Sequence, residues 1–170
     1  MARIDYADLK NPEIAALVSR IEAERGKVLN LYGMLLHSPP VAEGWLKLFT
    51  AIRQQGSLSG RLRELVIMQI AVVNQAQYEF DQHVPFALKE GIRQDQLDAL
   101  REGRVDSFTP LEQSVLAYAD SMTRDVHVPD AVFAAVKPHF SKRELVELTA
   151  TIAGYNLVSR FLEALQIDHE

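Results

Sequence analysis

Two helical segments joined at a short polar turn dominate the middle of this sequence. An apolar run, Ile67–Val73, ends at Asn74 and Gln75, and a second helical pattern follows over about residues 76–90. Apolar residues at helical spacing on both sides of the turn predict two α-helices. If the chain reverses at the turn, these helices form an antiparallel hairpin. We therefore expect an all-α bundle with this hairpin at its centre.

The hairpin would bring together acidic and basic side chains that are distant in the sequence. Glu64 and His83 are 19 residues apart, which would separate them by ~28 Å on one unbroken helix at ~1.5 Å per residue. In the hairpin they are symmetric about the turn and face each other. Glu79 precedes His83 by one helical turn, so these two share a face. We expect all three side chains to form one site.

Prolines, glycines and capping residues predict helices along the rest of the chain. Thr109 and Ser141 each begin a capping box that ends in glutamate. Asn11-Pro12 has the residues of a helix start, and Pro85 predicts a kink near residues 81–82 of the second hairpin helix. No long run alternates in the manner of a strand. The expected helices cover about 12–25, 29–36, 41–54, 59–73, 76–90, 95–101, 109–124, 129–136 and 141–165.

Length and charge narrow the class of protein. A chain of 170 residues and 19.1 kDa is long enough to bury a core, and we expect one domain over residues 1–170. The net charge of −5 disfavours nucleic acid and anionic membranes as partners. No apolar run approaches the ~18 residues of a membrane span, and the N-terminus does not have the apolar core of a signal peptide. A cytoplasmic protein is expected.

The absence of cysteine excludes a large part of the chemistry available to proteins. Disulfides, thiolate metal sites and cysteine nucleophiles are all impossible. A ferritin-type di-iron site needs Glu-x-x-His on two helices, whereas this chain has Glu-x-x-x-His once. It also has no His-Glu-x-x-His motif and no glycine-rich phosphate loop. We therefore expect neither a metal nor a cofactor; the alternative is a metal-dependent oxidase, which would need a metal held by Glu79 and His83.

Glu64, Glu79 and His83 together predict a proton-transfer site. A carboxylate can orient an imidazole and stabilise its charge, and burial moves the pKa values of such groups towards neutrality. The alternative is structural: Glu79 and His83 would form an exposed pair one turn apart, and Glu64 would favour the helix dipole from the first turn. Tyr78, Asn156 and Arg160 are expected to bind substrate, although Arg160 could also lie at a subunit contact or in solvent.

Several of these residues occur in the order of a known family. The pattern resembles the carboxymuconolactone decarboxylase family, which shares its fold with AhpD-type alkylhydroperoxidases. The resemblance implies an all-helical AhpD-like domain with an N-terminal arm at 1–10, a core motif at 59–91, and a homo-oligomer, as a dimer, trimer or hexamer. It rests on Arg63-Glu64, Asn74, Tyr78-Glu79-Phe80, His83, Ala87 and Gly91, with His37-Ser38-Pro39, Glu43-Gly44-Trp45, Leu111-Glu112, Tyr155-Asn156 and Arg160-Phe161.

One departure from that family decides which chemistry can be inherited. The peroxidase branch carries Cys-x-x-Cys on the helix of the histidine, and the resemblance puts Ala76 and Glu79 at those two positions. Peroxide reduction by that route needs a thiolate and a second thiol to resolve it. Thiol peroxidase activity is therefore not expected. The residues that remain resemble the decarboxylase branch, whose reaction needs a proton as carbon dioxide leaves a lactone acid.

Two functions follow from this comparison. The first is a cofactor-free lyase, in which His83 is the general acid/base, Glu64 and Glu79 tune it, and the substrate is a small organic acid. The second is a non-catalytic, ligand-binding helical oligomer that keeps the remnant of an alkylhydroperoxidase-type site without its cysteines.

Overall fold

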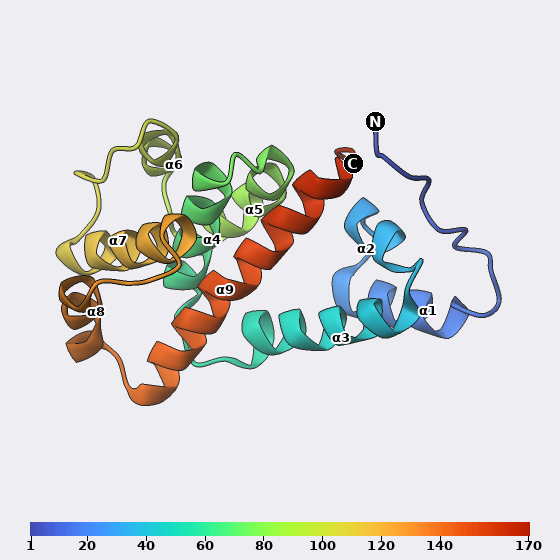
Figure 1. Cartoon of the computed structure of the whole chain (residues 1–170), viewed down its shortest axis with the longest axis horizontal. Coiled ribbons are helices and arrows are strands. Elements are labelled where there is room, and N and C mark those ends of the chain that lie inside the picture. The colour runs from blue at the N-terminus through green and yellow to red at the C-terminus, as the bar shows by residue number, and fades with distance from the viewer. The chain divides into compact units, whose positions relative to one another are not determined.

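The computed structural model describes all 170 residues and contains helices and no strands (Figure 1). No helix is both long enough and apolar enough to cross a membrane. The α-helices are α1 (Ala15–Arg25), α2 (Asn30–Leu35), α3 (Pro39–Thr50), α4 (Gly60–Val73), α5 (Gln77–Lys89), α6 (Gln94–Arg101), α7 (Pro110–Arg124), α8 (Asp130–Val136) and α9 (Lys142–Leu165). A π-helical segment, Ala51–Gln55, follows α3, and a 3-10 turn, Lys137–His139, follows α8.

The chain divides into two compact units. One contains Met1–Gln55 together with Leu162–Glu170, and the other is continuous over Gly56–Phe161. The candidate site lies in the second unit. The prediction of one domain over residues 1–170 stays a prediction.

Helices α4 and α5 form the expected hairpin at the centre of Gly56–Phe161. The chain reverses through Asn74, Gln75 and Ala76, and Gln75 has a φ of +57°, in the left-handed region that a tight reversal requires. Helix α5 continues through Pro85. Side chains of both helices pack with α6, α7 and the intervening loops in one buried apolar cluster: Leu65, Met68, Ala71, Phe80, Ala87, Ile92, Leu97, Leu100, Phe108 and Leu116.

Local capping residues fix where the hairpin and α7 begin. The Ser59 hydroxyl accepts a hydrogen bond from the backbone N–H of Leu62 at 3.3 Å, so α4 begins at the expected residue. Thr109 and Glu112 form the predicted capping box at the start of α7. Burial opposes ionisation of Glu112, but hydrogen bonds from Thr109 and Arg61 outweigh it and lower its pKa.

A carboxylate on α9 secures the loop that leads into α4. Glu147 Oε2 accepts hydrogen bonds from the backbone N–H groups of Ser57 and Leu58 and from the Ser57 hydroxyl, at 2.7–3.0 Å. Its second oxygen accepts from Arg143 Nε at 2.8 Å. The Arg143 hydrogen bond is the largest cause that lowers the pKa of Glu147, to about 2. One ionised side chain thus fixes the loop before the hairpin.

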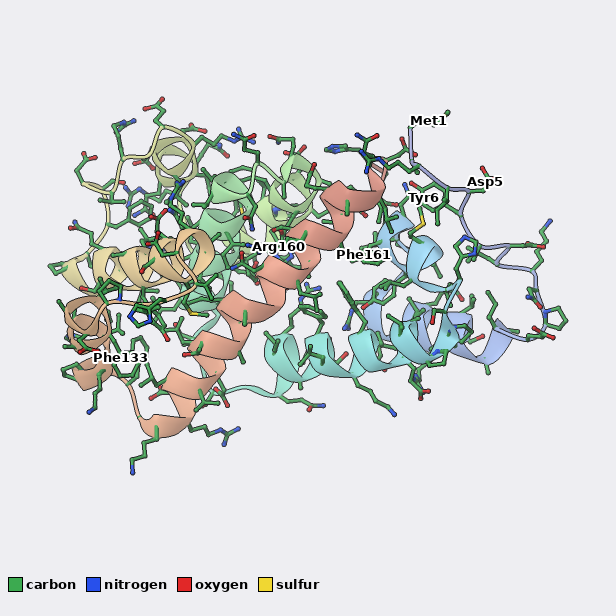
Figure 2. All side chains as sticks on the ribbon, viewed as in Figure 1. Met1, Asp5, Tyr6, Phe133, Arg160 and Phe161 are labelled. Atoms are coloured by element: carbon green, nitrogen blue, oxygen red, sulfur yellow. The ribbon has the colours of Figure 1, made fainter.

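In the other unit, the N-terminal arm pairs with the C-terminal residues. Arg3 N–H donates to the Leu165 carbonyl at 2.9 Å. The hydroxyl of Tyr6, which Figure 2 labels on the N-terminal segment, contacts Asp168. Arg25 from α1 donates to the hydroxyl of Thr50 at 2.7 Å. The arm is therefore held by specific hydrogen bonds at residues 2–6.

The structure corrects two helix starts. Helix α1 begins at Ala15 rather than near residue 12, because the Asn11 side chain accepts from Glu13 N–H in a local turn instead of starting a helix. Helix α3 begins at Pro39 rather than residue 41, since a proline is well suited to the first helical position. The π-helical segment after α3 was not expected.

Candidate functional site

Glu64 and His83 meet inside the hairpin, as the symmetry of the turn predicted. Glu64 lies in α4 and is 1% exposed, and His83 lies in α5 and is 7% exposed. His83 Nδ1 and Glu64 Oε2 are 2.7 Å apart. Glu64 Oε1 accepts a second hydrogen bond, from Arg63 Nε at 3.2 Å. Both oxygens of this carboxylate therefore have donors, and one donor carries a permanent positive charge.

The Glu64 hydrogen bond selects the tautomer of the imidazole. An ionised carboxylate can only accept, so the proton between the two residues belongs to Nδ1 of His83. This leaves Nε2 as the ring nitrogen that can exchange a proton with a bound molecule. The pair thus has the arrangement of an oriented general acid/base.

Aromatic side chains hold the imidazole from two directions. The ring of Tyr155, on α9, meets His83 edge-on with centroids 5.1 Å apart and an interplanar angle of 86°. Phe86, one turn along α5, lies 5.7 Å away. Edge-to-face and tilted packing of this kind restricts ring rotation. His83 therefore has a fixed orientation before any ligand is bound.

Glu79 is buried as well, but its contact lies on a different helix. It is 2% exposed, and its Oε2 makes a close hydrogen-bond contact with the hydroxyl of Ser159 on α9, which is fully buried. The Ser159 hydroxyl also lies 3.0 Å from the backbone carbonyl of Tyr155. The alternative of an exposed Glu79–His83 pair is therefore wrong, because both side chains are buried.

Two opposing effects act on the charge of Glu79. It lies in the first turn of α5, where the helix dipole favours a carboxylate by about 0.3–1 kcal/mol. Burying an ion costs several kcal/mol even after the protein relaxes. Burial is thus the larger effect at this residue.

The predicted substrate-binding residues fall in two places. Tyr78 is buried in α5 at 4% exposure. Asn156, on α9, links Asn74 at the hairpin turn to Thr123 on α7, with hydrogen bonds of 3.1 and 2.9 Å. The exposed Arg160, which Figure 2 labels on α9, donates to the side chain and to the backbone carbonyl of Asn156. Arg160 is therefore the predicted binding residue whose charge reaches the surface, and the binding roles stay predictions.

Sequence reasoning placed Asn156 and Arg160 of α9 at the site, but it did not pair Ser159 with Glu79 or Tyr155 with His83. Ser159 and Tyr155 contact Glu79 and His83, yet Ser159 is 80 residues from Glu79. The one available signal was a small polar residue within an otherwise apolar stretch of a long helix. Such a residue indicates a buried hydrogen bond without identifying its partner.

No group of three or more histidine, aspartate and glutamate side chains is arranged to hold a metal ion. Glu64 and His83 form a direct pair in which the ring nitrogen nearest the carboxylate is already used.

Comparison with known proteins gives one family and one curated relative. The profile of the carboxymuconolactone decarboxylase family matches residues 39–121, a range that includes the hairpin with Glu64, Glu79 and His83. The uncharacterised protein YdfG of Bacillus subtilis (strain 168) is 24% identical over 115 residues, which cover 66% of this chain and 78% of the relative.

Solved structures match over nearly the whole chain. A peroxidase-related protein of Ralstonia eutropha JMP134, described as an alkylhydroperoxidase AhpD core, has a TM-score of 0.84 at 19% identity and covers 99% of this chain and 92% of its own. A cysteine-to-alanine variant of the debrominase Bmp8, bound to 2,3,4-tribromopyrrole, has a TM-score of 0.82 at 18% identity, with coverage of 100% and 94%. At these identities the likeness shows the fold, which is AhpD-like.

Proposed function

We propose that this chain, which contains no cysteine and matches the carboxymuconolactone decarboxylase family over residues 39–121, is an enzyme that transfers a proton to or from a small organic acid. The reaction best suited to the site is decarboxylation of a lactone acid. The observation that carries the proposal is the buried hydrogen bond of 2.7 Å between Glu64 and His83.

The chemistry needs a single proton at one carbon atom. When the bond between that carbon and its carboxylate breaks, carbon dioxide leaves and the electron pair stays on the carbon. His83 Nε2, which carries no proton in this tautomer, would take up one proton and pass it to this carbon. Water supplies that proton overall, so the enzyme returns to its starting state. Glu64 would stabilise the charged imidazole and keep its orientation.

Arg160 supports a carboxylate-bearing substrate. Its guanidinium is exposed, and its hydrogen bonds are with the neutral Asn156 rather than with a carboxylate. Guanidinium groups bind carboxylates through paired N–H donors. Asn156 would hold Arg160 in place through its own hydrogen bonds to Asn74 and Thr123.

The complex of Bmp8 with a small halogenated ring supports a small-molecule ligand for this fold. That protein contains at least one cysteine, whereas this chain contains none. Debromination that depends on a thiol is therefore not carried over to this chain.

A panel of small lactone acids tests the proposal by release of carbon dioxide and loss of substrate. The wild type is compared with His83→Ala and with His139→Ala, whose imidazole is exposed and belongs to a different part of Gly56–Phe161. We expect turnover by the wild type and His139→Ala and a loss of at least about 100-fold in His83→Ala. Equal rates for all three would remove His83 from the mechanism.

A further inference from the structure

The hydrogen bonds around Ser159 contain one proton too few if Glu79 is ionised. A serine hydroxyl carries a single hydrogen. The Ser159 oxygen lies in hydrogen-bond contact with two oxygens, Glu79 Oε2 and the Tyr155 carbonyl. A carbonyl and a carboxylate both accept only. With Glu79 ionised, one of these two contacts would bring oxygen against oxygen without a hydrogen between them.

A proton on Glu79 completes the chain. The carboxylic acid then donates to the Ser159 oxygen, and the Ser159 hydroxyl donates to the carbonyl of Tyr155, at 3.0 Å in the usual i to i−4 geometry of a helical serine. Each of the two contacts, Glu79 to Ser159 and Ser159 to Tyr155, then has one donor and one acceptor. We propose that Glu79 is held as the neutral acid at neutral pH. Ser159 is the positioning residue whose oxygen accepts a hydrogen bond from the O–H of this acid.

The surroundings of the two glutamates favour opposite charge states. Glu64 accepts from the Arg63 guanidinium and from His83, so its negative charge is stabilised. Glu79 Oε2, by contrast, contacts a neutral hydroxyl, that of Ser159. A second anion, buried one helical turn from His83, would also repel Glu64 across that ring. Glu64 thus remains the anion and Glu79 the acid.

The competing arrangement has the same number of protons in a different place. His83 would be doubly protonated, a cation with hydrogen on both nitrogens, and both glutamates would be ionised around it. Within Gly56–Phe161, the ionisable side chains connected to this choice are Glu64 and Arg63 on α4, His83 on α5 and Tyr155 on α9. The position of one proton, on Glu79 or on His83, therefore separates the two arrangements.

This assignment deepens the proposed function, on which its catalytic meaning rests. A neutral Glu79 would be a stored proton one helical turn from the imidazole. It could supply the proton that His83 Nε2 passes to the substrate and then regain one from water, while Glu64 remains charged throughout. Pairs of carboxyl groups with different protonation states in one site are a common basis for acid–base catalysis.

Infrared difference spectroscopy at neutral pH tests the protonation state directly. We expect the carbonyl band of a protonated carboxylic acid in the wild type, its loss in Glu79→Gln, and its retention in Glu64→Gln. In Ser159→Ala we expect the band at a higher frequency, because the acid has lost its acceptor. Absence of a band that depends on Glu79 would overturn the proposal, as would nitrogen chemical shifts that show His83 doubly protonated at this pH.

Stability gives a second measurement that does not depend on a substrate. Glutamine resembles a neutral glutamic acid, so Glu79→Gln should keep the urea midpoint of the wild type, whereas Glu64→Gln should lower it. A larger loss in Glu79→Gln than in Glu64→Gln would contradict a neutral Glu79. If the Glu79 band is present but no lactone acid is turned over, the proposed function fails and this assignment stands. If a lactone acid is turned over but the Glu79 band is absent, this assignment fails and the proposed function stands.

Discussion

Glu64 Oε2 and His83 Nδ1 lie 2.7 Å apart, although the two residues are 19 positions apart and belong to different helices. The hairpin turn at residues 74–76 brings them together, and packing of the rings of Tyr155 and Phe86 fixes the imidazole. The geometry is therefore a property of the hairpin and of α9 rather than of any local motif.

Breaking this buried pair from one side should cost more than removing it completely. We expect His83→Leu to lower the free energy of unfolding by about 3 kcal/mol or more, because it leaves the Glu64 carboxylate without its imidazole. The double variant, Glu64→Leu with His83→Leu, should be closer to the wild type than the sum of the two single variants. Urea unfolding measures all four proteins. Single costs that add within about 0.5 kcal/mol would show that the two residues are not coupled.

Acid should loosen the loop before α4 through Glu147. The pKa of Glu147 in the folded protein, about 2, is below its ordinary value of 4.5. The ionised carboxylate therefore stabilises the fold above pH 4.5. The contribution is lost as the pH falls from 4.5 towards 2. Since the side chain is partly exposed, salt reduces the effect.

Glu147→Gln should therefore flatten the decline of stability between pH 5 and about pH 2. The matched control is Glu163→Gln, an exposed glutamate on the same helix. Thermal unfolding followed across this range gives the comparison. An unchanged pH profile in Glu147→Gln would show that the loop is held by other contacts.

The unmodified chain should not reduce peroxide with a thiol as the electron donor. The family resemblance puts Ala76 and Glu79 at the two positions where the peroxidase branch has cysteines. The chain contains no cysteine and therefore no thiol. Ala76→Cys combined with Glu79→Cys should recover a trace of activity, because Glu64 and His83 are retained. Coupled consumption of the thiol reports the rate. Robust turnover by the wild type would contradict this account of the site.

We expect the protein to form a symmetric oligomer. Val146 and Leu157 on α9 are 67% and 46% exposed, and both lie on a helix that is otherwise buried along much of its length. Exposed apolar side chains on one helix favour self-association. Light scattering at micromolar concentration measures the mass. A stable monomer of 19.1 kDa would contradict the expectation.

The sequence was informative where structure is set by local chemistry. Ser59, Thr109 and the prolines at helix starts act on their own neighbours, and the hairpin followed from two polar residues after an apolar run. The helix start predicted from Asn11 was wrong, because an asparagine side chain can close a single turn as well as cap a helix. The sequence could not pair Ser159 with Glu79, since that contact depends on how α9 lies across the hairpin.

The most direct test of proton transfer is decarboxylation of the best lactone acid in D₂O, with the product analysed by NMR. The account predicts one deuterium at the carbon that lost its carboxylate, formed at a rate that falls by at least about 100-fold in His83→Ala. The same product, formed by His83→Ala at the wild-type rate, would show that the proton does not pass through His83 and would contradict the account.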